Sequence, residues 1–237
     1  MKAFAYGVLL QWKIDVRRKD VFVTYYIVPL VFFFFMGGVF VSAMPGMKVT
    51  LISAMTIFAL SLGGYMGVPL SISAFYQSDL KKAYKVGGIP LWTPLVNSFL
   101  SAFIHLALVA CIICLVSPLA FNAEPLNQAA RYIIATAGLL CANGAISILL
   151  GLFIKSASKI SMVAVLLFLP SVVLSGIMMP AEFLPEILQT IGNFFPATWA
   201  YQAMNGVDFE LNTLFLFGLF GVLMIVNLVK LRRISQD

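Results

Sequence analysis

Charged residues are scarce in this chain. Of its 237 residues only 10% are Asp, Glu, Lys or Arg, whereas 62% are hydrophobic, and the mean hydropathy is +1.02. This composition excludes an ordinary soluble domain. Six apolar runs have interiors without any charge, and a helix satisfies its own backbone hydrogen bonds in lipid. We therefore expect a single all-α membrane domain over residues 1–237, with spans at about 21–43, 50–76, 93–121, 132–154, 160–180 and 211–230.

A phosphate-binding loop of the form Gly-x-x-x-x-Gly-Lys-[Ser/Thr] is absent from the sequence. The chain therefore does not bind ATP by itself in the P-loop manner, and we expect no cofactor in it. The spans also lack the ionisable groups of an ion-coupled carrier, since only His105 lies at membrane depth. A hydrogen bond from His105 to a neighbouring helix is favoured over a proton relay. Any energy for transport must come from elsewhere.

Cysteine is rare, with three residues at Cys111, Cys114 and Cys141. Cys111 and Cys114 share a helix face, but a closed zinc site needs four ligands. His105 lies on a different face of the same helix from Cys114. We expect three small packing residues and neither a metal site nor a disulfide framework. The absence of acids at depth also disfavours an intramembrane enzyme, so no catalytic residues are expected.

The basic residues lie mostly in alternate loops. All but two of the 15 lysines and arginines fall on one side of the expected spans, and the exceptions are Lys48 and Arg131. We expect a multi-pass protein of the cell (plasma) membrane. Because cytoplasmic loops are enriched in Lys and Arg, both of its termini are expected on the cytoplasmic side. The net charge of +6 is thus a topology signal, and no nucleic-acid partner is expected.

The most structured cytoplasmic piece is the loop 77–91. Ser78 is a candidate helix cap, Asp79 suits the positive end of a helix, and Gly87-Gly88 is a stop. One face would carry Leu80, Ala83 and Tyr84, and the other Lys81, Lys82 and Lys85. Two interpretations stay open: a basic loop that only fixes topology, and a short rigid helix that inserts into a cytoplasmic partner.

The first 20 residues also read as a helix. Phe4, Val8, Trp12 and Val16 recur every four residues among charged neighbours. This pattern predicts a helix at the inner membrane surface, held by membrane lipid.

Small residues form two stripes within the spans. They are Ala59, Gly63, Gly67 and Ser71 in span two and Asn143, Ser147 and Gly151 in span four. Both stripes predict close helix packing.

The segment after span five is neither a plain span nor a plain loop. Ser175-Gly176 and Pro180 end the apolar run. Helical spacing follows, and we expect its apolar members to bury against the spans as a short outer re-entrant helix: Phe183, Leu184, Ile187, Leu188 and Ile191. Phe194-Phe195-Pro196 and Trp199 then form an aromatic patch.

The assembled pattern resembles the permease subunit of an ABC-2 type transporter. Its most specific part is Ser-Gly-x-x-x-Pro at residues 175–180, then Phe-Leu-Pro-Glu-Ile-Leu at 183–188 and Phe195-Pro196 before Tyr201. The first loop departs from the family's frequent Glu-Arg-x-x-Gly start, since it reads Gln-Ser-Asp-Leu-Lys-Lys at 77–82.

The resemblance implies an ATP-driven exporter without catalytic groups of its own. Two permease chains would form the path, with spans one and five near the dimer interface and spans two and five lining the cavity. ATP and magnesium would bind separate ATP-binding subunits docked on the cytoplasmic loops. It assigns residues 78–85 to ATPase coupling. The pathway set is Tyr65, Met66, Ser171 and Leu174, and the outer-gate set is Ser175, Gly176, Met178, Met179, Pro180, Phe183 and Ile187.

The charge-free interior, rich in aromatic residues and methionine, favours a hydrophobic or amphipathic substrate. Two other classes stay open: a non-transporting scaffold or immunity subunit, and, with less support, an intramembrane enzyme. Co-purification of an ATP-binding subunit separates the exporter from both.

The distribution of basic residues predicts that residues 181–210 face outward. A single cysteine introduced by Glu186→Cys into a cysteine-free chain should react with an impermeant maleimide in intact cells. Reaction only after the membrane is permeabilised would show the opposite orientation.

Overall fold

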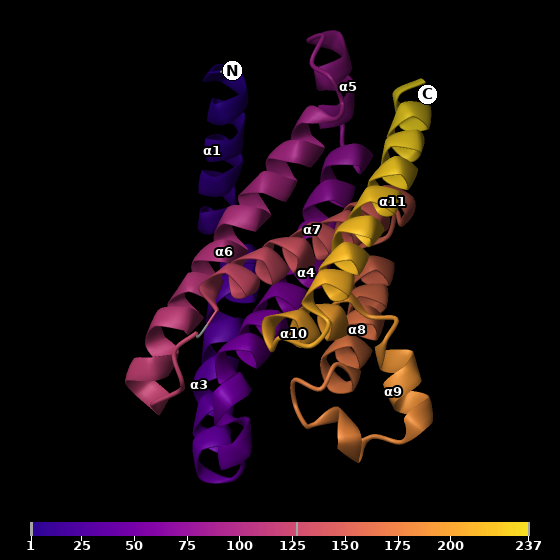
Figure 1. The fold of residues 1–237 in the computed structure, drawn as a ribbon. Helices are drawn as coiled ribbons and strands as arrows, with labels where there is room; N and C mark the ends of the chain where they lie inside the picture. The colour runs from indigo at the N-terminus through magenta and orange to yellow at the C-terminus, as the bar shows by residue number, and fades with distance from the viewer. Residues whose placement is uncertain (1, 127, 237) are drawn as a thin grey trace.

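The chain folds into a bundle of helices (Figure 1). The computed structural model describes residues 2–126 and 128–236, which are 85% helical and contain no strand. Both termini and α5 lie at one end of the bundle, and α9 lies at the other. The helices are α1 (Lys2–Arg17), α2 (Lys19–Phe22), η1 (Val23–Ile27), α3 (Val28–Ser42), η2 (Pro45–Thr50), α4 (Leu51–Gln77), α5 (Leu80–Val86), α6 (Thr93–Phe121), α7 (Ala129–Phe153), α8 (Ala157–Leu174), η3 (Ala181–Phe183), α9 (Glu186–Gly192), α10 (Pro196–Met204) and α11 (Phe209–Gln236).

Six helical stretches are long and apolar enough to cross a membrane, as predicted. The third, Thr93–Phe121, has the predicted bounds, but the fifth ends at Leu174 rather than near 180. Gly176 there has a φ of +86°, a left-handed conformation that ends a helix. The first span contains a π-helical turn, η1, which ends at Ile27, two residues before Pro29. Proline has no N–H to donate, and this local change in helix type accompanies its place in the span.

The second span is the core of the bundle. In its apolar segment 89% of the residues are buried, against 28% in the first and fifth spans and 17% in the sixth. Helix α4 packs against α6, α7 and α8 on different sides. The outer faces of spans one, five and six are thereby left for lipid or another chain.

Small residues on α4 make this central position possible. A Cβ atom at Gly67 would overlap the Tyr25 ring of span one, and one at Gly63 would overlap Leu106 of α6. On another face, Ser147 of α7 donates a 2.6 Å hydrogen bond to the Gly64 carbonyl. The predicted small-residue stripes therefore do mediate close packing, each with a different neighbour.

Helix α1 forms, as predicted, and one of its faces packs on the bundle. It packs along α6, and its contact face includes Gly7, where a Cβ would meet the Asn97 side chain, and the buried Asp15. Phe4 and Val16 of the expected stripe are exposed. These exposed residues leave part of the predicted stripe free for lipid, whereas the neighbouring Asp15 is buried because Ser101 of α6 is its polar partner.

The packing at Gly67 gives a stability prediction. Gly67→Ala should lower the free energy of unfolding by about 1–3 kcal/mol, because the methyl group overpacks the Tyr25 contact. Gly218→Ala on α11 is the matched control, since a Cβ there has no neighbour within 4 Å. Thermal unfolding in detergent measures both, and an equal effect of the two changes would contradict the packing.

Candidate functional site

Helix α5 has well-defined ends. At its start the Ser78 Oγ accepts a hydrogen bond from the Leu80 N–H at 3.3 Å and donates one to the Phe75 carbonyl at 2.9 Å. At its end the Ile89 N–H donates to the Tyr84 carbonyl and the Gly88 N–H to the Lys85 carbonyl. With Gly88 at a φ of +66°, this pair of bonds is a Schellman motif. Residues 78–88 thus form one capped unit.

The charges of α5 are directed outward. Asp79 and Lys82 form a 2.8 Å ion pair whose side chains are 90% and 82% exposed. Such a pair contributes little to stability because water screens it. Lys85 is also exposed, and Lys81 is half-buried. The basic surface is available to a partner or to lipid phosphate.

Tyr84 does not point toward a partner, and its expected place on a docking face is wrong. Its ring packs edge-to-face on Phe75 of α4, with centroids 4.9 Å apart. The physical reason is that the tight turn at residues 78–79 folds α5 back over the end of α4, where two aromatic rings bury surface together. Leu80 and Val86 instead carry the exposed apolar surface, at 56% and 91% exposed.

The loop after α5 is also held. The Tyr76 hydroxyl donates a hydrogen bond to the carbonyl of the buried Leu91. Pro94 then lies in the first turn of α6, where its missing N–H costs nothing. This bond joins the end of α4 to the turn before α6, and α5 lies between the two joined points.

The outer-gate residues start from the end of α8. Ser175 and Gly176 are buried, and the Ser175 Oγ donates back to the Val172 carbonyl at 3.1 Å. Gly192 closes α9 so near the Leu174 carbonyl that a Cβ would clash with it. Met178 and Pro180 are half-buried and Met179 is 39% exposed. The segment 175–192 thus leaves α8 and returns to its end.

The expected burial of the 183–191 face against the spans is wrong for its key members in the single chain. Phe183 and Ile187 are each 74% exposed, and Ile191 is 41% exposed. Leu184 and Leu188 are half-buried. Helix α9 has only seven residues, and its backbone contact at Gly192 fixes one end while the rest stands off the bundle.

The buried helix of this region is α10, whose residues were predicted to be part of an aromatic patch and not a helix. Ala197, Ala200 and Ala203 are fully buried, and the Thr198 Oγ1 donates a 2.6 Å bond to the Gly192 carbonyl. Pro196 at the first helical position and the three-residue repeat of alanine are the signals that could have found it.

The four pathway residues lie where α4 faces α8. Tyr65 and Ser171 are buried near one another, although the Ser171 Oγ has no hydrogen-bond partner among the described residues. Met66 and Leu174 are half-buried. Tyr65 and Ser171 are therefore enclosed by their own chain, and only Met66 and Leu174 retain partial exposure.

A polar cluster between α1, η1 and α6 was not predicted as a unit. Asp15 accepts hydrogen bonds from Ser101 at 2.6 Å and from Gln11 at 2.9 Å. Burial raises the pKa of the Asp15 carboxyl, and these two bonds partly oppose the rise. One turn further along α6, the His105 Nδ1 lies 2.7 Å from the Tyr26 hydroxyl, which confirms the expected bond to a neighbouring helix. Trp12 stacks on the same imidazole.

The Tyr84–Phe75 contact predicts the local stability of α5. Tyr84→Ala should speed amide hydrogen exchange over residues 80–88 by up to about tenfold, because an aromatic pair contributes about 0.5–1.5 kcal/mol. Leu80→Ala, at an exposed position of the same helix, should leave exchange unchanged. Equal exchange in the two variants would show that the ring contact does not hold α5.

Comparison with known families gives one match. The family model described as ABC-2 type transporter matches residues 6–209 of the chain. This range runs from α1 to the first residue of α11 and includes α5, α9 and α10. No curated protein matches the sequence.

Proposed function

This chain belongs to the ABC-2 type transporter family, and we propose that it is the permease subunit of an exporter driven by ATP hydrolysis in a separate subunit. As a member of this family with six apolar helices, it is a multi-pass membrane component of a transporter. In the proposal both termini and α5 face the cytoplasm across the plasma membrane, and ATP and magnesium bind only the partner.

One observation carries this proposal: α5 is a capped helix packed on α4, within the connection between the second and third spans. Its N-terminal side is joined to α4 through Ser78 and Tyr84, and its C-terminal side leads into α6 at Leu91. A topology signal would need only basic residues in any conformation. A capped helix packed on α4, by contrast, would transmit a push on α5 to the second span and, through the Tyr76–Leu91 bond, to the turn before the third.

The exposed surface of α5 fits an acidic-rimmed apolar groove on the ATP-binding subunit. Leu80 and Val86 are the exposed apolar residues of the helix, and Lys82 and Lys85 are exposed on the same helix. Buried apolar anchors dominate such contacts, whereas exposed charges mainly orient the partner. Tyr84 acts indirectly by holding the helix in place.

The proposal also includes a second permease chain. Spans one and five have low burial in the single chain and expose large apolar residues, among them Phe34, Phe35 and Leu166. At the outer end, the side chains of Phe183 and Ile187 are not covered by the rest of the chain. We place the partner permease against these surfaces, so that α9 completes an outer gate across the dimer. A hydrophobic or amphipathic substrate suits such a path.

The exporter function predicts a partner-dependent ATPase. The chain purified alone should hydrolyse no ATP, whereas the complex isolated from native membranes should contain an ATP-binding subunit and hydrolyse ATP. Val86→Asp should lower recovery of that subunit at least about tenfold, since the charge replaces an apolar anchor.

Val207→Asp is the matched control, because Val207 is an exposed valine at the turn between α10 and α11. It should leave recovery of the ATP-binding subunit unchanged at matched expression. Hydrolysis by the homogeneous single chain would overturn the subunit assignment. Equal recovery with Val86→Asp and the unaltered chain would overturn the role of α5.

A further inference from the structure

A basic hollow lies between α7 and α11, at the end of the bundle that carries both termini (Figure 1). It has a volume of about 270 Å³. One water takes about 30 Å³ in the liquid, so a group of several heavy atoms fits here. The lining comes from the last residue of α7 and the later part of α11: Phe153, Ile225, Val226, Val229, Lys230 and Arg233.

The basic hollow lies at a boundary of the membrane. Helix α11 has no charged residue between Glu210 and Lys230. At 1.5 Å per residue this stretch is about 30 Å long, which is the thickness of the hydrocarbon core of a bilayer. Lys230 and Arg233 therefore lie at the level of the lipid headgroups, and the apolar lining of the hollow lies just inside them.

The charges of the basic hollow are all positive. The Lys230 Nζ lies over the Phe153 ring, 4.9 Å from its centroid, and a cation–π contact of this kind holds the ammonium group in place. Arg233 is exposed. Neither cation forms an ion pair with any residue that the structure describes. Two cations without an acidic partner favour an anion, and a guanidinium suits a phosphate group.

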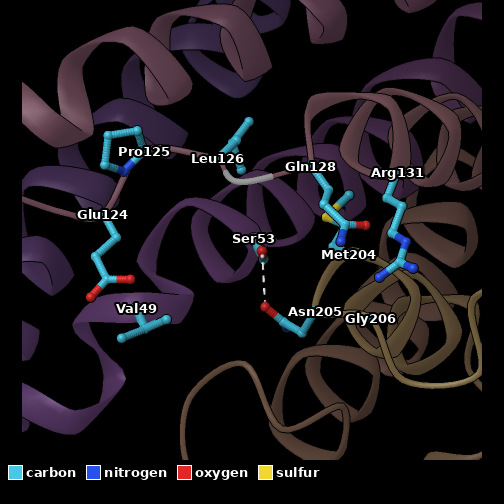
Figure 2. A pocket seen from close by; sticks show the side chains of 10 residues that line it. All are labelled: Val49, Ser53, Glu124, Pro125, Leu126, Gln128, Arg131, Met204, Asn205 and Gly206. Atoms are coloured by element: carbon cyan, nitrogen blue, oxygen red, sulfur yellow. Dashed lines mark hydrogen bonds between the residues drawn. The ribbon is translucent and has the colours of Figure 1, made fainter.

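The polar pocket at the other end of the bundle differs in this respect. Figure 2 shows Glu124 and Arg131 at opposite ends of that pocket. Arg131 also borders a neighbouring hollow, which is lined by Asp208 and Glu210. Acidic side chains therefore line both spaces beside Arg131, and they would repel an anion there. The basic hollow has the better charge for a phosphate group.

An uncovered apolar face of α11 leads from the basic hollow toward the middle of the membrane. Val229, Ile225 and Val222 lie on this face and are 48%, 65% and 61% exposed. Gly218 continues the face, and a Cβ atom there would have no neighbour within 4 Å. An acyl chain is the apolar occupant that a bilayer supplies along such a face. A phosphate site that continues into it matches a lipid.

We propose that the basic hollow binds an anionic glycerophospholipid. The phosphate accepts hydrogen bonds from Arg233 and lies beside the Lys230 ammonium group, while one acyl chain follows Ile225 and Val222 along α11. In the proposed topology this lipid belongs to the cytoplasmic leaflet, where basic pockets between spans bind anionic headgroups. The site belongs to a single chain and does not depend on the proposed ATP-driven export.

Short-chain lipids added to the delipidated full-length chain in detergent test the charge preference. Phosphatidylglycerol should raise the thermal unfolding temperature at concentrations about fivefold or more below those needed with phosphatidylcholine, whose choline group would face the two cations. Arg233→Gln should remove most of this preference. Arg232→Gln is the matched control, because it removes the same charge from the adjacent exposed residue, which does not line the hollow. It should leave the preference unchanged.

Chemical labelling tests the place of binding. In a chain carrying Cys111→Ala, Cys114→Ala and Cys141→Ala, the substitution Val229→Cys puts a single thiol in the hollow. Bound phosphatidylglycerol should slow the reaction of this thiol with N-ethylmaleimide at least threefold. Val207→Cys, at an exposed valine of the turn between α10 and α11, is the control and should react equally with and without lipid. The labelling also reports on the hollow if the arginine variant does not fold.

Four results would overturn the site. Equal effects of Arg233→Gln and Arg232→Gln would show a diffuse attraction to the basic end of the bundle. Equal effective concentrations of the two lipids would show that the charge has no role. An unchanged reaction rate of the thiol at position 229 would place the lipid elsewhere. If soluble glycerol phosphate stabilises the chain as well as phosphatidylglycerol does at equal concentration, the hollow binds a free phosphate ester and the apolar face of α11 has no role.

Discussion

The close approach of neighbouring helices to α4 is the constraint on which the rest of the structure depends. In lipid no hydrophobic force drives helices together, so contact area and interhelical hydrogen bonds hold the bundle. Gly63, Gly64 and Gly67 supply that area by admitting Leu106, Asn143 and Tyr25 against the backbone of α4. Hydrogen bonds from α7 add to it, as at Ser147 and between Thr56 and Tyr132 at 2.8 Å. A larger residue at these positions would separate the spans that carry the functional segments.

This central packing also decides where function resides. Because α4 is enclosed by its own chain, it offers little surface for a path, and Tyr65 lies inside the fold rather than beside an open space. The weakly covered spans are the first, fifth and sixth. Segments that protrude from the ends of the bundle, α5 at one and α9 at the other, keep exposed apolar residues that the bundle does not use. In the proposed complex, these exposed residues are the ones that the partner chains would bind.

The spans and the small-residue stripes could be predicted from the sequence because both follow from local patterns. A run of apolar residues determines a span in lipid, and the capping residues around α5 act within a few positions. What failed depended on distant partners. Tyr84 was assigned to a docking face because its contact with Phe75 requires the turn between α4 and α5. The burial of Asp15 was not predicted because its partner Ser101 lies 86 positions away in sequence. Exposure of Ile187 likewise depends on how α9 stands off the bundle, which periodicity does not specify.

The buried cluster at Asp15 connects the early part of α6 to α1 and to the first span. Helix α6 begins directly after the loop that follows α5, and Ser101 and His105 lie one turn apart on its early part. Ser101 joins it to α1, and His105 joins it to the π-turn of the first span through Tyr26. These polar contacts lie in a poorly solvated region, where leaving a partner unsatisfied is costly. A displacement of α5 that moves the start of α6 must therefore carry α1 and the first span with it, or break those bonds. In the proposed coupling, the first three spans would therefore move together.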